Sequence, residues 1–398
     1  MLSSLFIFVP LFQCIVYFYI YLFLFCSNYH YLCFIYRAFQ KIEQFARRFG
    51  FPCETHQVTT EDGYILTLHR IPGGRGPKPK TNGGVVLLFP GLMASSETWL
   101  FRGADKDLPY VFADSGFDVW ICNPRGNFFS RRHKTLDPDK DLRFWNYSIH
   151  EYGVFDLPAS VDYALNVTKQ NSLFFIGHSI GASAFFIMCS LKPDYNRKIR
   201  LATLLAAAAY ITQPVTPLTQ FILSFIPPLT KVIKENEVHE EIFPRGGMIT
   251  SLAQILCRDG AITRSFCISG IFGVVGRNNK QFNYTLLPEV LNYYPSGTSF
   301  NVLVHVHDIL IKRRFGPING PNGTEYDLKM ITAPVSLHYA DGDAIISKED
   351  NEFLAKRLPN VVGLFKVPYH NFNHIDFMWG IDSKILVYDH LINILKQY

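Results

Sequence analysis

Two features are missing from the sequence, and each argues against a class of function. None of the eight cysteines forms a C-x-x-C pair, which argues against a zinc site. Lysine and arginine are dispersed without a basic stripe carrying interleaved aromatic residues, and the net charge of +5 is small for 398 residues. Nucleic acid is therefore not an expected partner. With 48% hydrophobic and 18% charged residues, the chain also lacks the composition of a disordered protein.

Charge is absent from most of the N-terminal segment. Residues 5–25 contain no charged side chain, and this apolar run is close to the ~20 residues that span a bilayer and longer than an ordinary signal-peptide core. There is no Ala-x-Ala cleavage site, and basic residues only follow the segment. By the positive-inside rule that arrangement would leave the protein body in the cytosol. We expect residues 1–36 to be a signal peptide or a membrane anchor.

Glycosylation sequons point to the opposite side of the membrane. Four Asn-x-Ser/Thr sequons are typical of surface loops in secretory proteins, and they lie at Asn146, Asn166, Asn283 and Asn322. Cys257 and Cys267 are close enough in sequence to close a short loop, and a disulfide between them would suit an oxidising compartment. We therefore expect the chain to enter the secretory route, with the N-terminal segment either cleaved or retained.

Short apolar runs alternate with helical patterns along most of the chain. A turn followed by alternating residues at 61–71 indicates an early antiparallel hairpin, and residues 37–51 indicate a helix. The expected buried strands are 85–91, 117–122, 172–176, 199–209, 333–340 and 362–369, and the expected helices are 156–169, 348–358 and 381–397. This alternation predicts an α/β fold with a mostly parallel sheet covered by helices on both faces.

The alternation breaks between residues 210 and 326. Prolines and helical pieces there surround the apolar patch Phe221–Leu229. We expect this region to be a cap inserted over the active site, with the core formed by residues 37–209 and 327–398. An independent second domain is the alternative. The large side chains of the patch either meet lipid, line a pocket or pack within the cap, because periodicity does not place them.

Ser179 lies in the stretch around which the expected chemistry is organised. The apolar strand 172–176 leads into Gly177-His-Ser-Ile-Gly181, and small and apolar residues at helical spacing follow. Strand, G-x-S-x-G and helix together predict a nucleophile elbow, whereas the five-residue pattern alone would fit a surface turn equally well. The turn is too tight for side chains two residues before and after the serine. The N–H groups that begin the following helix point towards the hydroxyl.

A serine nucleophile needs a base, and the base needs an orienting acid. Asp343 follows the strand 333–340 and His374 follows the strand 362–369, so the chain order Ser–Asp–His is the order found in α/β-hydrolases. Other side chains nearby compete for these roles, and they are Asp341, Asp376, His370 and His178. His178 adjoins the nucleophile and points away from it by turn geometry, so we expect a structural role for it.

Several stretches of the chain resemble the acid lipase family, which contains gastric and lysosomal acid lipases. They extend from about residue 49 to the C-terminus. The matching stretches are Phe51-Pro-Cys-Glu54, residues 60–68, Asp118-Val-Trp120, Arg125-Gly-Asn127, residues 155–159, Gly297-Thr-Ser299 and residues 373–377. The resemblance implies an α/β-hydrolase fold with an inserted helical cap and a mobile lid.

The same resemblance implies roles for particular residues. It selects Asp343, which begins the segment D-A-I-I-S-K-E-D, as the acid, and His374 of the N-H-x-D-F motif as the base. It also implies a disulfide at positions like Cys257 and Cys267. The implied substrates are neutral lipids, triacylglycerols or steryl esters, met at a lipid–water interface.

The chain departs from the family pattern at two positions beside the nucleophile. Pro90 stands where the family usually has histidine, and Ile180 stands where it usually has glutamine. The expected oxyanion donors are the main-chain N–H groups of Leu92 and Ile180, and neither of these residues is proline. A loop displaced by Pro90 could remove one donor, which typically costs ~10²–10³ in rate.

The residues and the resemblance together predict a serine lipase. We expect it to hydrolyse fatty-acyl esters of neutral lipids through an acyl-enzyme, without a metal or an organic cofactor, and to be secreted or lysosomal or membrane-associated through its N-terminus. A carboxylesterase acting on smaller esters and a catalytically impaired lipid-binding relative are the alternatives.

Overall fold

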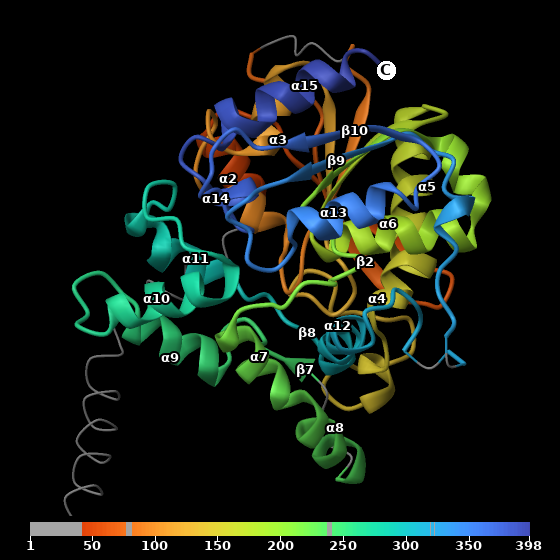
Figure 1. Cartoon of the computed structure of the whole chain (residues 1–398). Helices are drawn as coiled ribbons and strands as arrows, with labels where there is room; N and C mark the ends of the chain where they lie inside the picture. The colour runs from red at the N-terminus through yellow and green to blue at the C-terminus, as the bar shows by residue number, and fades with distance from the viewer. Residues whose placement is uncertain (1–41, 77–81, 237–240, 319, 322) are drawn as a thin grey trace, which may run out of the picture.

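The computed structural model describes residues 42–76, 82–236, 241–318, 320–321 and 323–398 (Figure 1). The N-terminal segment 1–36 and the sequon residue Asn322 lie outside these ranges. The strands are β1 (Glu54–Thr59), β2 (Ile65–Ile71), β3 (Val85–Phe89), β4 (Asp118–Cys122), β5 (Leu173–His178), β6 (Ile199–Leu205), β7 (Glu241–Ile242), β8 (Thr298–Ser299), β9 (Val335–Tyr339) and β10 (Val361–Lys366).

Helices occupy most of the remaining described chain. The α-helices are α2 (Ile42–Arg48), α3 (Leu108–Asp114), α4 (Ile149–Glu151), α5 (Leu157–Thr168), α6 (Ile180–Leu191), α7 (Pro217–Ser224), α8 (Ile226–Glu235), α9 (Met248–Leu256), α10 (Arg264–Val275), α11 (Leu287–Tyr293), α12 (Phe300–Lys312), α13 (Lys348–Ala355), α14 (Asp376–Trp379) and α15 (Asp389–Leu395). Short 3-10 or π-helical segments lie at Ser96–Trp99, Leu142–Trp145, Tyr152–Asp156, Pro193–Lys198, Tyr284–Leu286, Leu328–Met330 and Lys384–Tyr388.

Eight strands form one sheet in the order β1-β2-β4-β3-β5-β6-β9-β10. The pairs β1–β2 and β2–β4 are antiparallel, and the strands from β4 to β10 in this order pair in parallel. The predicted α/β fold with a mostly parallel sheet is confirmed. In such a sheet the carboxyl ends of the parallel strands lie along one edge, where ligands bind.

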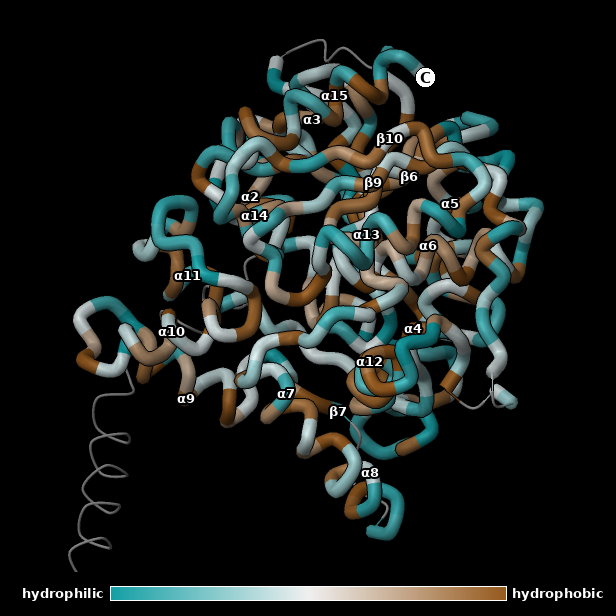
Figure 2. Tube along the Cα trace, viewed as in Figure 1, coloured by the Kyte–Doolittle hydropathy of each residue, from teal (hydrophilic) through white to brown (hydrophobic). Residues whose placement is uncertain are grey.

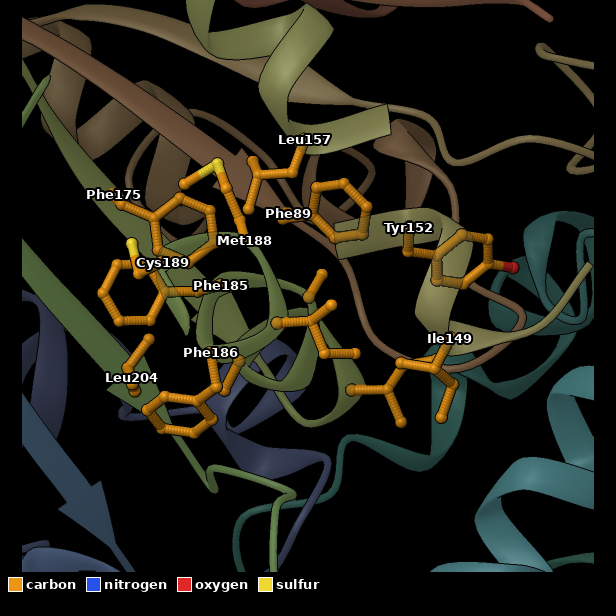
Figure 3. Packing of buried hydrophobic residues seen from close by; sticks show 14 of the residues in the cluster. Phe89, Ile149, Tyr152, Leu157, Phe175, Phe185, Phe186, Met188, Cys189 and Leu204 are labelled. Carbon is orange, nitrogen blue, oxygen red and sulfur yellow. The ribbon is translucent and has the colours of Figure 1, made fainter. Parts of the chain in front are cut away.

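The sheet is buried on both faces because successive residues of each strand point to opposite sides. In β3, the side chains of Val85, Leu87 and Phe89 belong to one hydrophobic cluster, whereas Val86 and Leu88 belong to the other. The first cluster packs against α5 and α6. Figure 3 shows part of it, in which the ring of Phe175 from β5 stacks on that of Phe185 from α6, with centroids 5.3 Å apart. The second cluster packs against α2, α3 and α15. This packing fixes the strands whose ends carry the candidate site.

Two details of the sheet differ from the sequence prediction. The early antiparallel hairpin forms, with β2 following the predicted turn. Its first strand, β1, precedes the turn and was not predicted, because its residues are mostly polar. The strand predicted at 199–209 ends at Leu205. Ala206 takes a positive φ of 49°, and its N–H turns to the carbonyl of His338, so the chain leaves the sheet there.

Residues 210–326 leave the sheet and carry helices α7–α12 (Figure 1). Large hydrophobic side chains are exposed along α7–α10, where Figure 2 shows hydrophobic residues on the outside of the molecule. Of the patch Phe221–Leu229, Phe221 is 62% exposed, and α7 buries none of its residues. Most large side chains of this patch are therefore not packed internally, and Ile226, which is 5% exposed, is the exception. Among the described residues, no helix has both the length and the apolar character needed to cross a bilayer.

Candidate active site

Ser179 lies at the junction of β5 and α6. Its φ of 55° and ψ of −121° are unfavourable for a residue with a side chain, which is the strain expected of a nucleophile elbow. A Cβ added to Gly177 would lie 2.9 Å from the main-chain nitrogen of Ala182, and one added to Gly181 would collide with the carbonyl oxygen of Phe89. Both glycines are thus required by close backbone packing, as the sequence predicts.

The candidate acid and base meet beyond the ends of β9 and β10. The Nδ1 of His374 lies 2.8 Å from Oδ2 of Asp343, and both side chains are buried. Oδ1 of the same aspartate accepts main-chain N–H groups of Ile345 (2.8 Å) and Ile346 (3.0 Å). Since a carboxylate can only accept here, Nδ1 carries the proton and Nε2 is left as the basic nitrogen.

The competing acid and base lie elsewhere. Asp341 forms an ion pair with Lys366 at 2.6 Å and lies 3.3 Å from Nδ1 of His370, whose side chain is 84% exposed. Asp341, Lys366 and His370 thus form a cluster at the protein surface. The structure thus places Asp343, and not Asp341, against His374.

His178 connects the elbow to the loop of the base. Its Nε2 lies 2.9 Å from the main-chain oxygen of His374, so Nε2 carries the proton and donates it to that carbonyl. Burial, followed by the neighbouring His374, lowers the pKa of His178 to about 3 and keeps the ring neutral. Through this bond the residue next to Ser179 holds the backbone of His374. Within the described chain no hydrogen bond joins the hydroxyl of Ser179 to His374, and such contacts commonly tighten when substrate binds.

The expected oxyanion loop runs directly against the elbow. A Cβ added to Gly91 would lie 3.3 Å from Cβ of Ser179, so the segment that follows Pro90 touches the nucleophile. Ile180 is the first residue of α6, where main-chain N–H groups have no partner within the helix. The neighbouring Met93 has a positive φ of 54°, so the backbone of this loop bends sharply. The loop therefore lies beside Ser179 even though residue 90 is proline.

A buried ion pair that the sequence analysis did not identify lies next to this loop. Glu97 is 1% exposed, and its Oε2 lies 2.5 Å from Nη1 of Arg245, which comes from the segment between β7 and α9. The guanidinium also lies over the rings of Phe128 (4.3 Å) and Tyr293 (5.0 Å). Burial raises the pKa of Glu97 to about 7 against the opposing effect of Arg245. The pair connects the segment between β7 and α9 to Glu97, which follows the expected oxyanion loop in sequence.

The described chain contains one disulfide and three of the four sequon asparagines. Cys257 and Cys267 form a disulfide bond, whereas Cys122 and Cys189 are buried free thiols. The side chains of Asn146 and Asn166 are exposed, and Asn283 is partly buried. In the described part of the chain, no group of three or more His, Cys, Asp or Glu side chains is arranged to hold a metal ion.

Comparisons with known proteins agree with this fold. A crystal structure from Sulfolobus solfataricus superposes with a TM-score of 0.58 at 16% identity, covering 87% of this chain and 95% of the other. A family model described as "alpha/beta hydrolase fold" matches residues 84–230, and one described as "Partial alpha/beta-hydrolase lipase region" matches residues 42–103. The protein is an α/β-hydrolase.

Two relatives identify the family within this class. Lipase 1 of Drosophila melanogaster is 35% identical over 369 residues, which cover 89% of this chain and 80% of the relative. Human lysosomal acid lipase/cholesteryl ester hydrolase is 31% identical over 367 residues, covering 88% and 89% respectively. The chain belongs to the acid lipase family, as the sequence motifs predict, and is an ester hydrolase by that membership.

Proposed function

We propose that this protein is a serine lipase that hydrolyses fatty-acyl esters of neutral lipids, triacylglycerols or steryl esters. Nε2 of His374 takes the proton of Ser179 while Oγ attacks the ester carbonyl, and Asp343 stabilises the imidazolium that forms. The N–H groups of Leu92 and Ile180 stabilise the oxyanion. His374 then protonates the departing alcohol, and water repeats the cycle on the acyl-enzyme.

One observation carries the proposed reaction. The strained Ser179 lies at the end of β5, and the hydrogen-bonded pair of His374 and Asp343 lies beyond the ends of the parallel strands β9 and β10. His178 links the two halves through the carbonyl of His374. A nucleophile, a base with its proton fixed on Nδ1 and an orienting carboxylate at one sheet edge are the parts that acyl transfer requires.

The exposed helices supply the argument for a lipid substrate. We propose residues 210–326 as the cap of the hydrolase core, which residues 37–209 and 327–398 form. Phe221, Phe225, Met248, Ile262 and Phe266 are each between 48% and 95% exposed on α7–α10 and the connecting loops. Exposing so many large apolar side chains to water is unfavourable, and binding at a lipid–water interface would bury them. A lipase therefore explains this face better than an esterase for small soluble esters does.

The test is fatty-acid release from triolein, a cholesteryl ester and a short soluble ester by the wild type and by Ser179→Ala. We expect the wild type to favour the two lipid esters, and the variant to lose at least ~10³-fold in kcat. Faster hydrolysis of the soluble ester would favour a carboxylesterase. A wild type that binds lipid but is as inert as the variant would favour a lipid-binding relative, with Pro90 as the cause.

We propose the secretory route as the location of the protein. The Cys257–Cys267 disulfide and the exposed sequon residues Asn146 and Asn166 support it, as does a relative named lysosomal acid lipase. Glycosidase treatment of the expressed protein should increase its mobility in gel electrophoresis. An unchanged mobility of the wild-type protein after treatment would count against this location.

A further inference from the structure

Three stretches of backbone that are far apart in sequence are stacked beside the candidate acid. A Cβ added to Gly276, the residue after α10, would collide with the carbonyl oxygen of Gly342. A Cβ added to Gly342 would lie 2.6 Å from the carbonyl carbon of Asn371 and 2.7 Å from the carbonyl oxygen of Phe372. Gly342 is thus held between the end of α10 and the loop of the base. The loop at 340–347 is called the acid loop below, and the loop at 368–375 the base loop.

Hydrogen bonds join these three stretches through the last residue of α10. The carbonyl oxygen of Val275 accepts the main-chain N–H groups of Ala344 and His374, both at 3.3 Å. One donor belongs to the acid loop and the other is the base residue itself. α10 belongs to the proposed cap, so a cap helix ends on both loops that carry the acid and the base.

Asn278 extends this connection to the far side of the base loop. Its Nδ2 donates to Oδ2 of Asp376 at 2.6 Å, and the same oxygen accepts the main-chain N–H of Asn373 at 2.8 Å. The side chain of Asn373 in turn donates to the carbonyl of Gly276 at 2.8 Å. Asn278, Asn373 and Asp376 are each no more than 1% exposed. Asn373 and Asp376, which flank residues 374–375, therefore both form hydrogen bonds with the segment that follows α10.

We propose that Asn278 is a positioning residue that fixes the base loop, and with it His374, on the end of cap helix α10. Nothing in Asn278 reaches the reacting atoms, so it acts through Asp376 and the backbone of residues 373–376. This role rests on the proposed hydrolase function. It implies that the proposed cap helps to position the base and the acid, in addition to covering the site.

The test uses two variants at position 278 and one matched control. Asn278→Ala removes the whole side chain, including Oδ1, which accepts the N–H groups of Lys280 (3.3 Å) and Gln281 (3.2 Å). Asn278→Asp keeps this acceptor, removes the N–H donor to Asp376 and places a second titratable carboxyl beside it. Gln281→Ala is the control, because Gln281 is equally buried in the same segment but its side chain bonds Asp382.

We expect kcat for a short soluble ester to fall about 10- to 100-fold in both position-278 variants, because a loop misplaced by a fraction of an ångström has effects of this size. KM should stay within about twofold, since the loop does not bind the substrate. Gln281→Ala should keep the wild-type kcat. In Asn278→Asp the loss of kcat relative to the wild type should be larger at pH 8 than at pH 5. At the lower pH a proton shared between the carboxyl groups of residues 278 and 376 restores the hydrogen bond between these two side chains. Asp343 and Arg102 are the other charges that act on Asp376.

Wild-type kcat in Asn278→Asp, or an equal loss in Gln281→Ala, would overturn the positioning role while leaving the hydrolase intact. A deficit that is the same at pH 5 and pH 8 would also overturn it. A wild type without any hydrolytic activity would instead overturn the proposed function, and this role with it.

Discussion

Asp376 is a fully buried carboxyl whose titration makes the free energy of unfolding depend on pH. Its Oδ2 accepts hydrogen bonds from Asn373 and Asn278, and its Oδ1 has no hydrogen-bond partner among the described residues. Burial raises its pKa to about 7, and the charge of Asp343 adds to this effect. The two hydrogen bonds and Arg102 oppose the rise without cancelling it. Asp376 therefore holds a proton in the folded protein at pH values where the unfolded chain has released it.

The sign and size of the effect follow from this difference. Because the folded pKa lies above the unfolded value of 3.8, the stabilisation from the bound proton is complete below that value and is lost as the pH rises to about 7. A rise of the pKa by roughly 3, at about 1.4 kcal/mol per unit, corresponds to a loss of up to ~4 kcal/mol over this range. Asp376→Asn keeps an oxygen acceptor and cannot titrate. Its unfolding free energy should therefore fall less than that of the wild type between pH 4 and pH 8.

Urea denaturation at several pH values between 4 and 8 measures this difference. Ser383→Ala is the matched control, because the Ser383 hydroxyl donates to the main-chain carbonyl of Asp376 and does not titrate in this range. Its curve should run parallel to that of the wild type. If the Asp376→Asn curve is also parallel to the wild type, Asp376 does not hold the proton, and the reasoning from its burial is wrong.

Two further predictions concern the disulfide and the buried ion pair. Replacing Cys257 and Cys267 by serine opens a loop with a sequence separation of 10, and chain entropy then predicts a loss of ~2.7 kcal/mol; an unchanged urea midpoint under oxidising conditions would contradict it. Glu97→Gln or Arg245→Met alone leaves one buried partner uncompensated and should cost about 3–5 kcal/mol, whereas the double variant should cost less than the sum. A double-mutant cycle measures this, and additive losses would show that the two side chains do not interact.

The elbow around Ser179 could be predicted because all its determinants are contiguous. A buried strand, two glycines and a helix lie within 20 residues, and local sequence alone dictates the turn. Asp343 and His374 could be proposed because each follows a strand of a parallel sheet, whose ends meet at one edge. The choice between Asp343 and Asp341 needed family resemblance, since two residues of one loop differ only in which way they face.

Other parts of the fold leave no local signal. β1 is a polar strand at the edge of the sheet that the described residues form, beside β2, and it lacks the apolar run by which buried strands are recognised. Asn278 lies 98 residues from Asp376, and Glu97 lies 148 residues from Arg245. Each contact exists only once segments that are distant in sequence have folded against one another. Sequence patterns report periodicity along the chain, and these pairs depend on its tertiary arrangement.

The measurement that tests the central claim most directly is labelling with a fluorophosphonate, which forms a bond between phosphorus and an activated serine oxygen as fluoride leaves. Peptide mass spectrometry of the wild type should find one adduct, on Ser179, and Ser179→Ala should take up none. An adduct on another residue, or equal labelling of both proteins, would contradict the assignment of Ser179 as the nucleophile.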